Sequence, residues 1–376
     1  MNGTDLGTVA VPPAPQPTAE QLAKSLAAKF LENGNYEALG APLSHEAAYK
    51  YAQAAVMADV EEWFDHEDGF SGLAVHSVGF TPGAEMEKVV IYVVRGSKRA
   101  LEAVADEIDG IPVEARLMGK LKAGPTAMNA PGGGNLYERN NRIACGSSCA
   151  PSREKYAGTF GALLRTGAKM QALSNNHVFA ACNHTPVGMP ILAPSSMDSR
   201  PGRRAPTEIC LHERIIELRS GDPVLVAPMT LDAALAEVVN EAVVSSWQGD
   251  AAGFDTPAAT AALFSGMKVK KVGRTTGLTT GTVEAYVPTP WILPYKAGKF
   301  SATVWFTDTW TVRTSDDAEP FALPGDSGSL VVTEDGSSAV GLLFAVNNRG
   351  QYGIIMPITQ VLAAFGNAAL VSGHGI

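Results

Sequence analysis

The amino-acid sequence predicts a mostly β protein preceded by a small α+β domain. Its 38 glycines and 24 prolines accompany only 18% charged residues, a composition that favours many short strands joined by tight turns. The spacing of apolar residues also changes along the chain, from helical periodicity near the start to short apolar runs beyond residue 143. At 376 residues, the chain is long enough for two or three folding units.

The composition argues against several classes of function. A net charge of −9 disfavours nonspecific binding of nucleic acid, which needs Lys and Arg to neutralise phosphates. No apolar run approaches the roughly 20 residues that span a bilayer, so we expect no membrane partner. Residues 1–17 lack the basic and apolar segments of a signal peptide, and four cysteines are too few for a disulfide scaffold. We therefore expect a cytoplasmic protein.

The first third of the sequence predicts a flexible tail and one small domain. Residues 1–17 are rich in proline and are expected to form the tail. Thr18 and Gln21 have the spacing of a capping box, which predicts a helix ending near Asn33-Gly34. Residues 18–123 form the expected N-terminal helical and α+β domain. Its further expected elements are a helix from Ser44 towards Trp63, strands at 73–80 and 89–94, a helix at 97–109 and a strand at 111–121.

The rest of the chain divides into a linker and a β-rich domain. Residues 124–142 include two prolines and three consecutive glycines, a composition typical of a linker. Residues 143–376 contain short apolar runs separated by turns, and an amphipathic stretch at 358–365 predicts a closing helix.

The strongest local signal for chemistry is the segment 324–332, Pro-Gly-Asp-Ser-Gly-Ser-Leu-Val-Val. Its glycines permit a tight turn that can expose the hydroxyl of Ser327 and point the amides of Gly325 and Ser327 at one spot. Two converging N–H groups form an oxyanion hole, which stabilises the charge that develops in acyl transfer. A plain β-turn is the alternative, because Asp, Ser and Gly are common turn residues.

A serine nucleophile needs a general base, and the base needs an orienting acceptor. His177 follows an apolar strand and begins a predicted short helix. Asp232 is the single carboxylate of the apolar run 229–236, where an unpaired charge would be costly. We therefore expect Asp232 to face a donor such as an imidazole N–H, and we predict that His177, Asp232 and Ser327 are catalytic.

The order of these residues and the motifs around them resemble the chymotrypsin-like (trypsin-like) serine proteases. Residues 173–178, 231–235 and 325–328 look like the three motifs of that family, and Gly-Arg-Thr-Thr-Gly at 273–277 is similar to a segment of its bacterial secreted members. The sequence is most similar to a bacterial and plant branch that includes the plant narrow-leaf protein. The resemblance covers about residues 143–365 and implies a protease domain of two β-barrels.

The sequence departs from the family in two respects. Secreted relatives carry cysteines where this chain has Val178 and Val272, which fits a reducing compartment. Animal relatives are activated when a cut frees an apolar N-terminus that pairs with the aspartate before the serine. No such cleavage site is visible in this sequence, so Asp326 must have another partner.

The resemblance also implies a specificity pocket. By analogy, Phe321 lies at its base, and Phe344 and Val346 lie on the strand opposite. Because position 321 is not an aspartate, a basic side chain would find no counter-charge, and Val346 should narrow the entrance. The expected P1 residue, which precedes the cleaved bond, is therefore small or medium-sized and apolar.

The cysteines and two of the histidines leave a second interpretation open. Cys182, His184, Cys210 and His212 form two Cys-x-His pairs that could make a tetrahedral zinc site. Their spacing is unlike the usual finger pattern, so we expect separate loops and neither a metal nor another cofactor. Cys145 and Cys149 flank a short turn and could form a small disulfide, although reduced thiols are the default in a cytoplasm.

Together these observations predict a serine endopeptidase acting on a protein or peptide substrate. The alternatives are a protease-fold binding or scaffold protein without turnover, and a zinc-stabilised regulatory module. Helix 18–33 is too short to be stable alone in water. We expect the N-terminal domain to pack against the protease domain or a second copy of the chain, as in a homo-oligomer, and to control access to Ser327. Recruitment of partners by an independent domain is the alternative.

Overall fold

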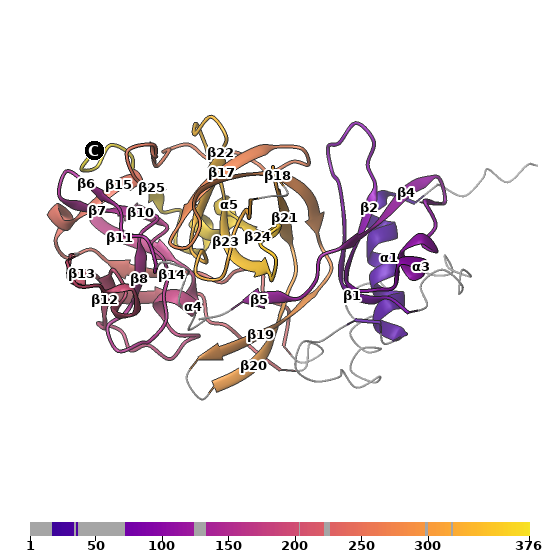
Figure 1. The fold of residues 1–376 in the computed structure, drawn as a ribbon, viewed down its shortest axis with the longest axis horizontal. Helices are drawn as coiled ribbons and strands as arrows, with labels where there is room; N and C mark the ends of the chain where they lie inside the picture. The colour runs from indigo at the N-terminus through magenta and orange to yellow at the C-terminus, as the bar shows by residue number, and fades with distance from the viewer. Residues whose placement is uncertain are drawn as a thin grey trace, which may run out of the picture.

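The computed structural model describes residues 17–33, 35–36, 72–123, 133–202, 204–221, 226–297, 300–316 and 319–376. Figure 1 shows the N-terminal domain in indigo beside an orange and yellow barrel, with a magenta β-rich unit on the far side of that barrel. The predicted fold class, a double β-barrel preceded by a small α+β domain, is confirmed. The helix expected from Ser44 towards Trp63 and nearly all of the expected tail lie outside the described residues.

Six strands of the second half of the chain close into a barrel. They are β17 (Lys268–Gly273), β18 (Gly277–Val287), β21 (Thr309–Thr314), β22 (Leu330–Thr333), β23 (Ala339–Asn347) and β24 (Tyr352–Pro357). The order is β17-β22-β23-β24-β21-β18, and β17 also pairs with β18, which closes the ring. The Gly-Arg-Thr-Thr-Gly segment joins these two strands in a hairpin. The predicted closing helix is α5 (Ile358–Ala364).

The first half of the protease-like region is a curled eight-stranded sheet with a smaller sheet beside it. Its strands are β8 (Ser148–Pro151), β9 (Gly158–Thr159), β10 (Ala162–Thr166), β11 (Lys169–Ser174), β12 (Pro190–Ala193), β13 (Thr207–Ile215), β14 (Ala234–Glu237) and β25 (Ala369–Leu370). Their order is β25-β10-β11-β14-β13-β12-β8-β9. The smaller sheet contains β6 (Glu138–Arg139), β7 (Arg142–Cys145), β15 (Val244–Gln248) and β16 (Phe254–Asp255). An apolar core fills the space between them.

The N-terminal domain is joined directly to the second barrel. Helix α1 (Ala19–Glu32) has the predicted capping box of Thr18 and Gln21, and it shares a core with β1 (Ala74–Phe80) and β2 (Val89–Arg95). Strand β1 pairs with β18 at Phe80 and Tyr286, so the domain sheet continues the barrel sheet. The same core includes side chains of the hairpin β19 (Trp291–Ala297) and β20 (Phe300–Phe306). The domain therefore packs against the second barrel.

The helix expected at 97–109 is wrong in length. Helix α3 (Lys98–Glu102) has one turn and a half, and β3 (Glu107–Ile108) then pairs with β4 (Ile111–Leu117). Asp109 and Gly110 join the two strands with φ angles of 50° and 80°. Asp-Gly is a preferred pair for the hairpin turn in which both central residues have positive φ. This turn chemistry overrides the helical spacing of the apolar residues.

The strand expected at 111–121 is two strands in different places. β4 ends at Leu117 and pairs with β2, whereas β5 (Leu121–Ala123) pairs with β23 of the barrel. Residues 133–142, expected to belong to a linker, pack against the protein: the amide of Gly134 donates to Asp198 at 2.7 Å, and that of Asn135 donates to the Arg274 carbonyl at 2.8 Å. Residues 124–132 lie outside the described part of the chain.

Candidate active site

His177 and Asp232 form a buried hydrogen-bonded pair. Strand β11 ends at Ser174, and helix α4 (Asn176–Phe179) begins two residues later, which places His177 in its single turn. The Nδ1 atom of His177 lies 2.5 Å from Oδ2 of Asp232, and the amide of His177 donates to Oδ1 at 3.2 Å. The two side chains are 1% and 0% exposed. The structure thus gives Asp232 an imidazole partner.

Tyr295 is a third member of this cluster that the sequence did not indicate. Its hydroxyl, on β19, donates to Oδ2 of Asp232 at 2.8 Å, and its ring meets that of His177 edge-on with centroids 5.8 Å apart. Burial, together with the neighbouring Asp232 carboxylate, raises the pKa of Tyr295 well above its usual value. The hydroxyl therefore stays protonated and remains a donor to Asp232.

Ser327 lies in a loop whose glycines are required by close contacts. Gly325 and Gly328 have φ angles of 104° and 94°, which L-residues with side chains rarely adopt. A Cβ atom on Gly328 would lie 2.2 Å from Oγ of Ser174, at the end of β11. The carbonyl of Ser327 accepts from the amide of Thr159 at 2.9 Å. These contacts press the Ser327 loop against the strand end that precedes His177.

The hydrogen bond between Ser327 and His177 is not formed. Oγ of Ser327 instead donates to the carbonyl of Phe344 at 3.4 Å, and Nε2 of His177 is buried without a hydrogen-bond partner among the described residues. The amides of Gly325 and Ser327 likewise have no hydrogen-bond acceptor among the described residues. A buried acceptor nitrogen and two uncommitted amides are what a reacting ester or amide group would require at this place.

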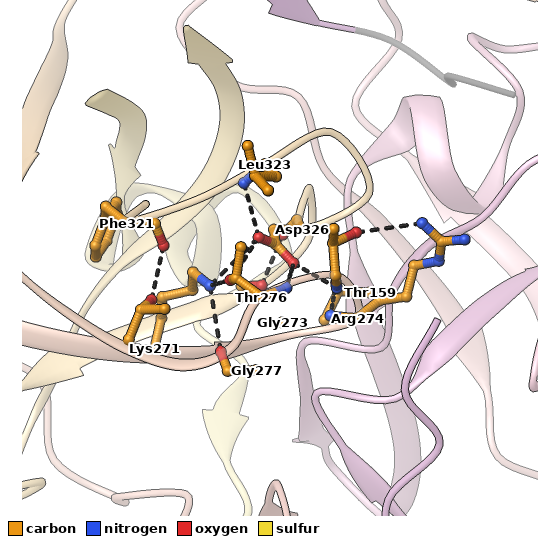
Figure 2. Close-up of polar contacts among 12 residues, drawn as sticks. Thr159, Lys271, Gly273, Arg274, Thr276, Gly277, Phe321, Leu323 and Asp326 are labelled. Atoms are coloured by element: carbon orange, nitrogen blue, oxygen red, sulfur yellow. Dashed lines mark hydrogen bonds and ion pairs between the residues drawn. The ribbon is translucent and has the colours of Figure 1, made fainter. Parts of the chain in front are cut away.

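Asp326 is held by five donors, and Lys271 supplies its ionic partner. Figure 2 shows Lys271, Thr276 and Leu323 around the Asp326 carboxylate. The amides of Thr275 and Thr276 donate to Oδ1 at 2.7 and 3.1 Å. The hydroxyl of Thr276, the amide of Leu323 and Nζ of Lys271 donate to Oδ2 at 2.7, 2.9 and 3.4 Å. The partner that Asp326 was expected to need is therefore an internal lysine.

Lys271 is buried together with Asp326, and both side chains are 0% exposed. Its ammonium group also donates to the Thr276 hydroxyl at 2.5 Å and to the Gly277 carbonyl at 3.3 Å. Burial lowers the pKa of Lys271, and the charge of Asp326 opposes that change. Gly273 makes room for the arrangement, because a Cβ atom there would lie 2.3 Å from Oδ1 of Asp326.

A second buried ion pair fastens the Ser327 loop to the first half of the protease-like region. Arg274 donates from Nε and Nη2 to the two carboxylate oxygens of Asp198, each at 2.6 Å. The amide of Arg274 donates to the hydroxyl of Thr159 at 3.0 Å, and this hydroxyl donates to the carbonyl of Gly325 at 3.0 Å. Arg274, the centre of the Gly-Arg-Thr-Thr-Gly segment, thus pairs with Asp198 and leaves Asp326 to Lys271.

The three residues expected at the specificity pocket do not all lie together in the structure. Phe321 and Val346 share the core inside the second barrel, whereas Phe344 belongs to another core and contacts the ring of Phe306, with centroids 4.9 Å apart. Phe321 is fully buried. Gly281 and Gly353 leave space for its ring, because a Cβ atom on either would lie within 2.9 Å of it. Only Phe321 and Val346 therefore face the same space.

The two Cys-x-His pairs lie apart. Cys182 and Cys210 are buried in different apolar cores, and the Nδ1 atoms of His184 and His212 contact the carbonyls of Ala181 and Pro186. Among the described residues, no three His, Cys, Asp or Glu side chains are grouped so as to hold a metal ion. All four cysteines are free and buried, including Cys145 and Cys149, and burial raises the pKa of each thiol.

The family model of the Nal1 C-terminal domain matches residues 230–355. This match covers about a third of the chain and includes Asp232 and Ser327, while His177 precedes it. It agrees with the predicted resemblance to the branch that contains the plant narrow-leaf protein. No curated protein sequence matches the chain. Among the described residues, no helix has the length and apolar character needed to cross a bilayer.

Solved structures similar to this chain include several proteases and human heparin binding protein. Thermobifida fusca protease A shares 18% identity over 61% of this chain and 100% of its own, with a TM-score of 0.40. Nocardiopsis protease shares 16% identity over 60% and 97% of the two chains, with a TM-score of 0.40. Cellulomonas bogoriensis chymotrypsin shares 16% identity over 61% and 98%, with a TM-score of 0.38.

Proposed function

We propose that this protein is a serine endopeptidase that hydrolyses peptide bonds through an acyl-enzyme. The state of His177 carries the proposal. Its Nδ1 atom is held by Asp232, while its buried Nε2 atom has no partner among the described residues. A histidine fixed on one nitrogen has the other available to accept a proton. The adjoining loop offers Ser327 as the proton donor.

In the proposed reaction, Ser327 turns from the Phe344 carbonyl towards His177 and attacks the scissile carbonyl carbon, while Nε2 of His177 takes the hydroxyl proton. The amides of Gly325 and Ser327 hold the oxyanion. The imidazolium then protonates the leaving amine, which departs and leaves an ester on Ser327. A water molecule, deprotonated by His177, attacks that ester and releases the acid. Asp232 orients the imidazole and stabilises its charged form.

We further propose that the enzyme prefers a small or medium-sized apolar P1 residue. The apolar side chains of Phe321 and Val346 occupy the barrel side of the expected pocket. A Lys or Arg side chain would therefore have no counter-charge there. One pocket contact changes selectivity by about 1–3 kcal/mol, which corresponds to roughly 10- to 200-fold. A peptide library should therefore show Ala or Val preferred at P1, and dominant cleavage after Arg would refute this preference.

Reaction with a fluorophosphonate tests the proposed function. We expect the wild-type protein to gain one phosphonyl group on Ser327, detected by intact mass and peptide mapping. Ser327→Ala and His177→Ala should fail to react and should lose turnover of a peptide substrate by a factor on the order of 10⁴–10⁶. Their thermal unfolding should match that of the wild type. Ser337→Ala, which changes an exposed serine, is the control and should label normally.

One observation favours the alternative of a binding or scaffold protein without turnover. Ser327 donates to Phe344 and not to His177, so the nucleophile is not activated in this conformation. A folded wild-type protein that neither reacts with the fluorophosphonate nor cleaves any library peptide would support this alternative and overturn the endopeptidase.

A further inference from the structure

One edge of β23 passes Ser327 and then pairs with a strand from the N-terminal part of the chain. Close to the serine, the amide of Gly328 donates to the Leu343 carbonyl at 2.9 Å, and the next carbonyl, that of Phe344, accepts from Ser327. Beyond that point β5 takes the edge, in the antiparallel register Ala123↔Ala345, Lys122↔Val346 and Leu121↔Asn347. Strand β24 occupies the other edge. Figure 1 shows β5 reaching back to the barrel from the N-terminal domain.

The direction of β5 is that of a substrate. Its register brings the chain closer to Phe344 and Ser327 as the residue number rises from Leu121 to Ala123. In acyl transfer to Ser327, the acyl part of a peptide ends at the attacked carbonyl, so it too approaches the serine in the direction of rising residue number. An extended peptide commonly binds by adding a strand to a free sheet edge. β5 therefore has the place and the direction of the acyl half of a peptide substrate.

The end of β5 farther from Ser327 is firmly anchored. Met118 and Leu121 are only 1% and 2% exposed and belong to the main apolar core. The Asn347 side chain donates to the Met118 carbonyl at 2.8 Å, and the amide of Asn348 donates to the Lys120 carbonyl at 2.8 Å. These bonds hold the segment before β5 at the end of β23 that is farther from Ser327.

The end of β5 nearer to Ser327 buries much less. The Lys122 side chain is exposed and that of Ala123 is half-buried. Segments with little buried apolar surface open locally at a lower free energy than the core around them. The Lys122–Ala123 end can therefore leave β23 while Met118 and Leu121 remain in place.

We propose that β5 is an internal occupant of the peptide-binding edge of β23 and limits access of substrates to Ser327. This inference rests on the proposed endopeptidase. A substrate needs the backbone groups of Ala345–Asn347 that β5 now pairs with, and one sheet edge accepts one strand at a time. The apparent affinity for a substrate equals the intrinsic affinity multiplied by the fraction of molecules in which the edge is free. An edge free in about a tenth of the molecules would lower kcat/KM about 10-fold.

Two changes of β5 in the full chain test the proposal. Ala123→Pro removes a backbone N–H and disfavours strand pairing, whereas Ala123→Ser keeps the N–H and is the matched control. Ala123→Pro should raise both the rate of fluorophosphonate labelling and kcat/KM for an apolar peptide by about 10-fold, and Ala123→Ser should leave both unchanged. A synthetic peptide of residues 117–123 should inhibit the Ala123→Pro variant competitively.

A disulfide provides a second test that does not depend on the proline variant folding. Ala123→Cys combined with Ala345→Cys places cysteines at directly paired positions, at the end of β5 that is proposed to leave the edge. The oxidised form, verified by mass, should be several-fold slower than the same protein after reduction. Equal rates in both forms, with Ala123→Pro as slow as the wild type, would show that β5 does not limit access of substrates. That result would overturn this inference but not the proposed endopeptidase. Absence of labelling at Ser327 in every folded variant, Ala123→Pro included, would instead overturn the proposed function.

Discussion

Replacing Lys271 with methionine should destabilise the protein and disable the Ser327 loop. Lys271 and Asp326 are both fully buried, with Nζ and Oδ2 3.4 Å apart. Methionine keeps a similar length of side chain but leaves the Asp326 carboxylate without its cation. Breaking a buried ion pair from one side costs about 3–5 kcal/mol. With an unfolding entropy of about 2.1 cal/mol/K per residue, a chain of 376 residues shifts by about 1.3 °C per kcal/mol, so the thermal midpoint should fall by roughly 4–6 °C.

The catalytic effect should be separable from the loss of stability. Asp326 lies between Gly325 and Ser327, whose amides are the proposed oxyanion donors. If the Asp326 carboxylate moves out of its site, the adjoining backbone moves and both amides are displaced. Loss of one such donor costs about 10²–10³ in kcat. We therefore expect kcat of Lys271→Met, measured well below its thermal midpoint, to fall at least about 100-fold, with KM changing little.

Lys268→Met is the matched control, since Lys268 is exposed on the same strand β17. Its free energy of unfolding in urea should stay within about 0.5 kcal/mol of the wild type. Asp326→Asn should be less harmful in the Lys271→Met background than in the wild type, because no charge is then left unpaired. Wild-type stability and turnover of Lys271→Met would refute the assigned role of this pair.

Two further predictions concern the residues around the site. Tyr295→Phe removes the hydroxyl donated to Asp232 and should lower kcat about 10-fold with little change in KM, because a hydrogen bond to a charged group contributes about 1.5–3 kcal/mol; initial-rate kinetics measure this. Burial raises the pKa of Asp198, but hydrogen bonds from Arg274 and Ser148 outweigh that and lower it. Its stabilisation is therefore present above the usual pKa of 3.8 and lost in stronger acid. Asp198→Asn should cost about 3–5 kcal/mol at pH 7, and its urea unfolding should depend less on pH in acid than that of the wild type.

The sequence indicated the residues with local motifs and missed those whose partners are distant. Ser327 and His177 lie beside glycines or at a strand end, features that short patterns reveal. Tyr295 meets Asp232 63 residues away, and Lys271 meets Asp326 55 residues away. The sequence established only that Asp326 needs a partner. Alternation along β17, where Val269 and Lys271 are both buried, was a signal that could have marked this lysine as inward-facing.

The same distinction applies to the fold. The capping box of α1 and the hairpin of β17 and β18 depend on neighbouring residues and were predictable. The helix expected at 97–109 failed because apolar spacing was weighed above the Asp109-Gly110 turn, a local signal that was present. The pairing of β5 with β23 was not predictable, because strand partners far apart in sequence are selected by the packing of the whole domain and not by the three residues of β5.

The two ion pairs and β5 together bear on where control of this site can act. In the animal proteases of the family that the sequence resembles, a new N-terminus must reach the aspartate before the serine. Here Lys271 belongs to the barrel itself and already occupies Asp326, while Arg274 and Asp198 tie the loop to the opposite side. Formation of the Ser327 loop therefore needs no cleavage of the chain. If the chain is the proposed endopeptidase, control can act on access to Ser327 without any cleavage, and we propose that it acts at the edge of β23 covered by β5.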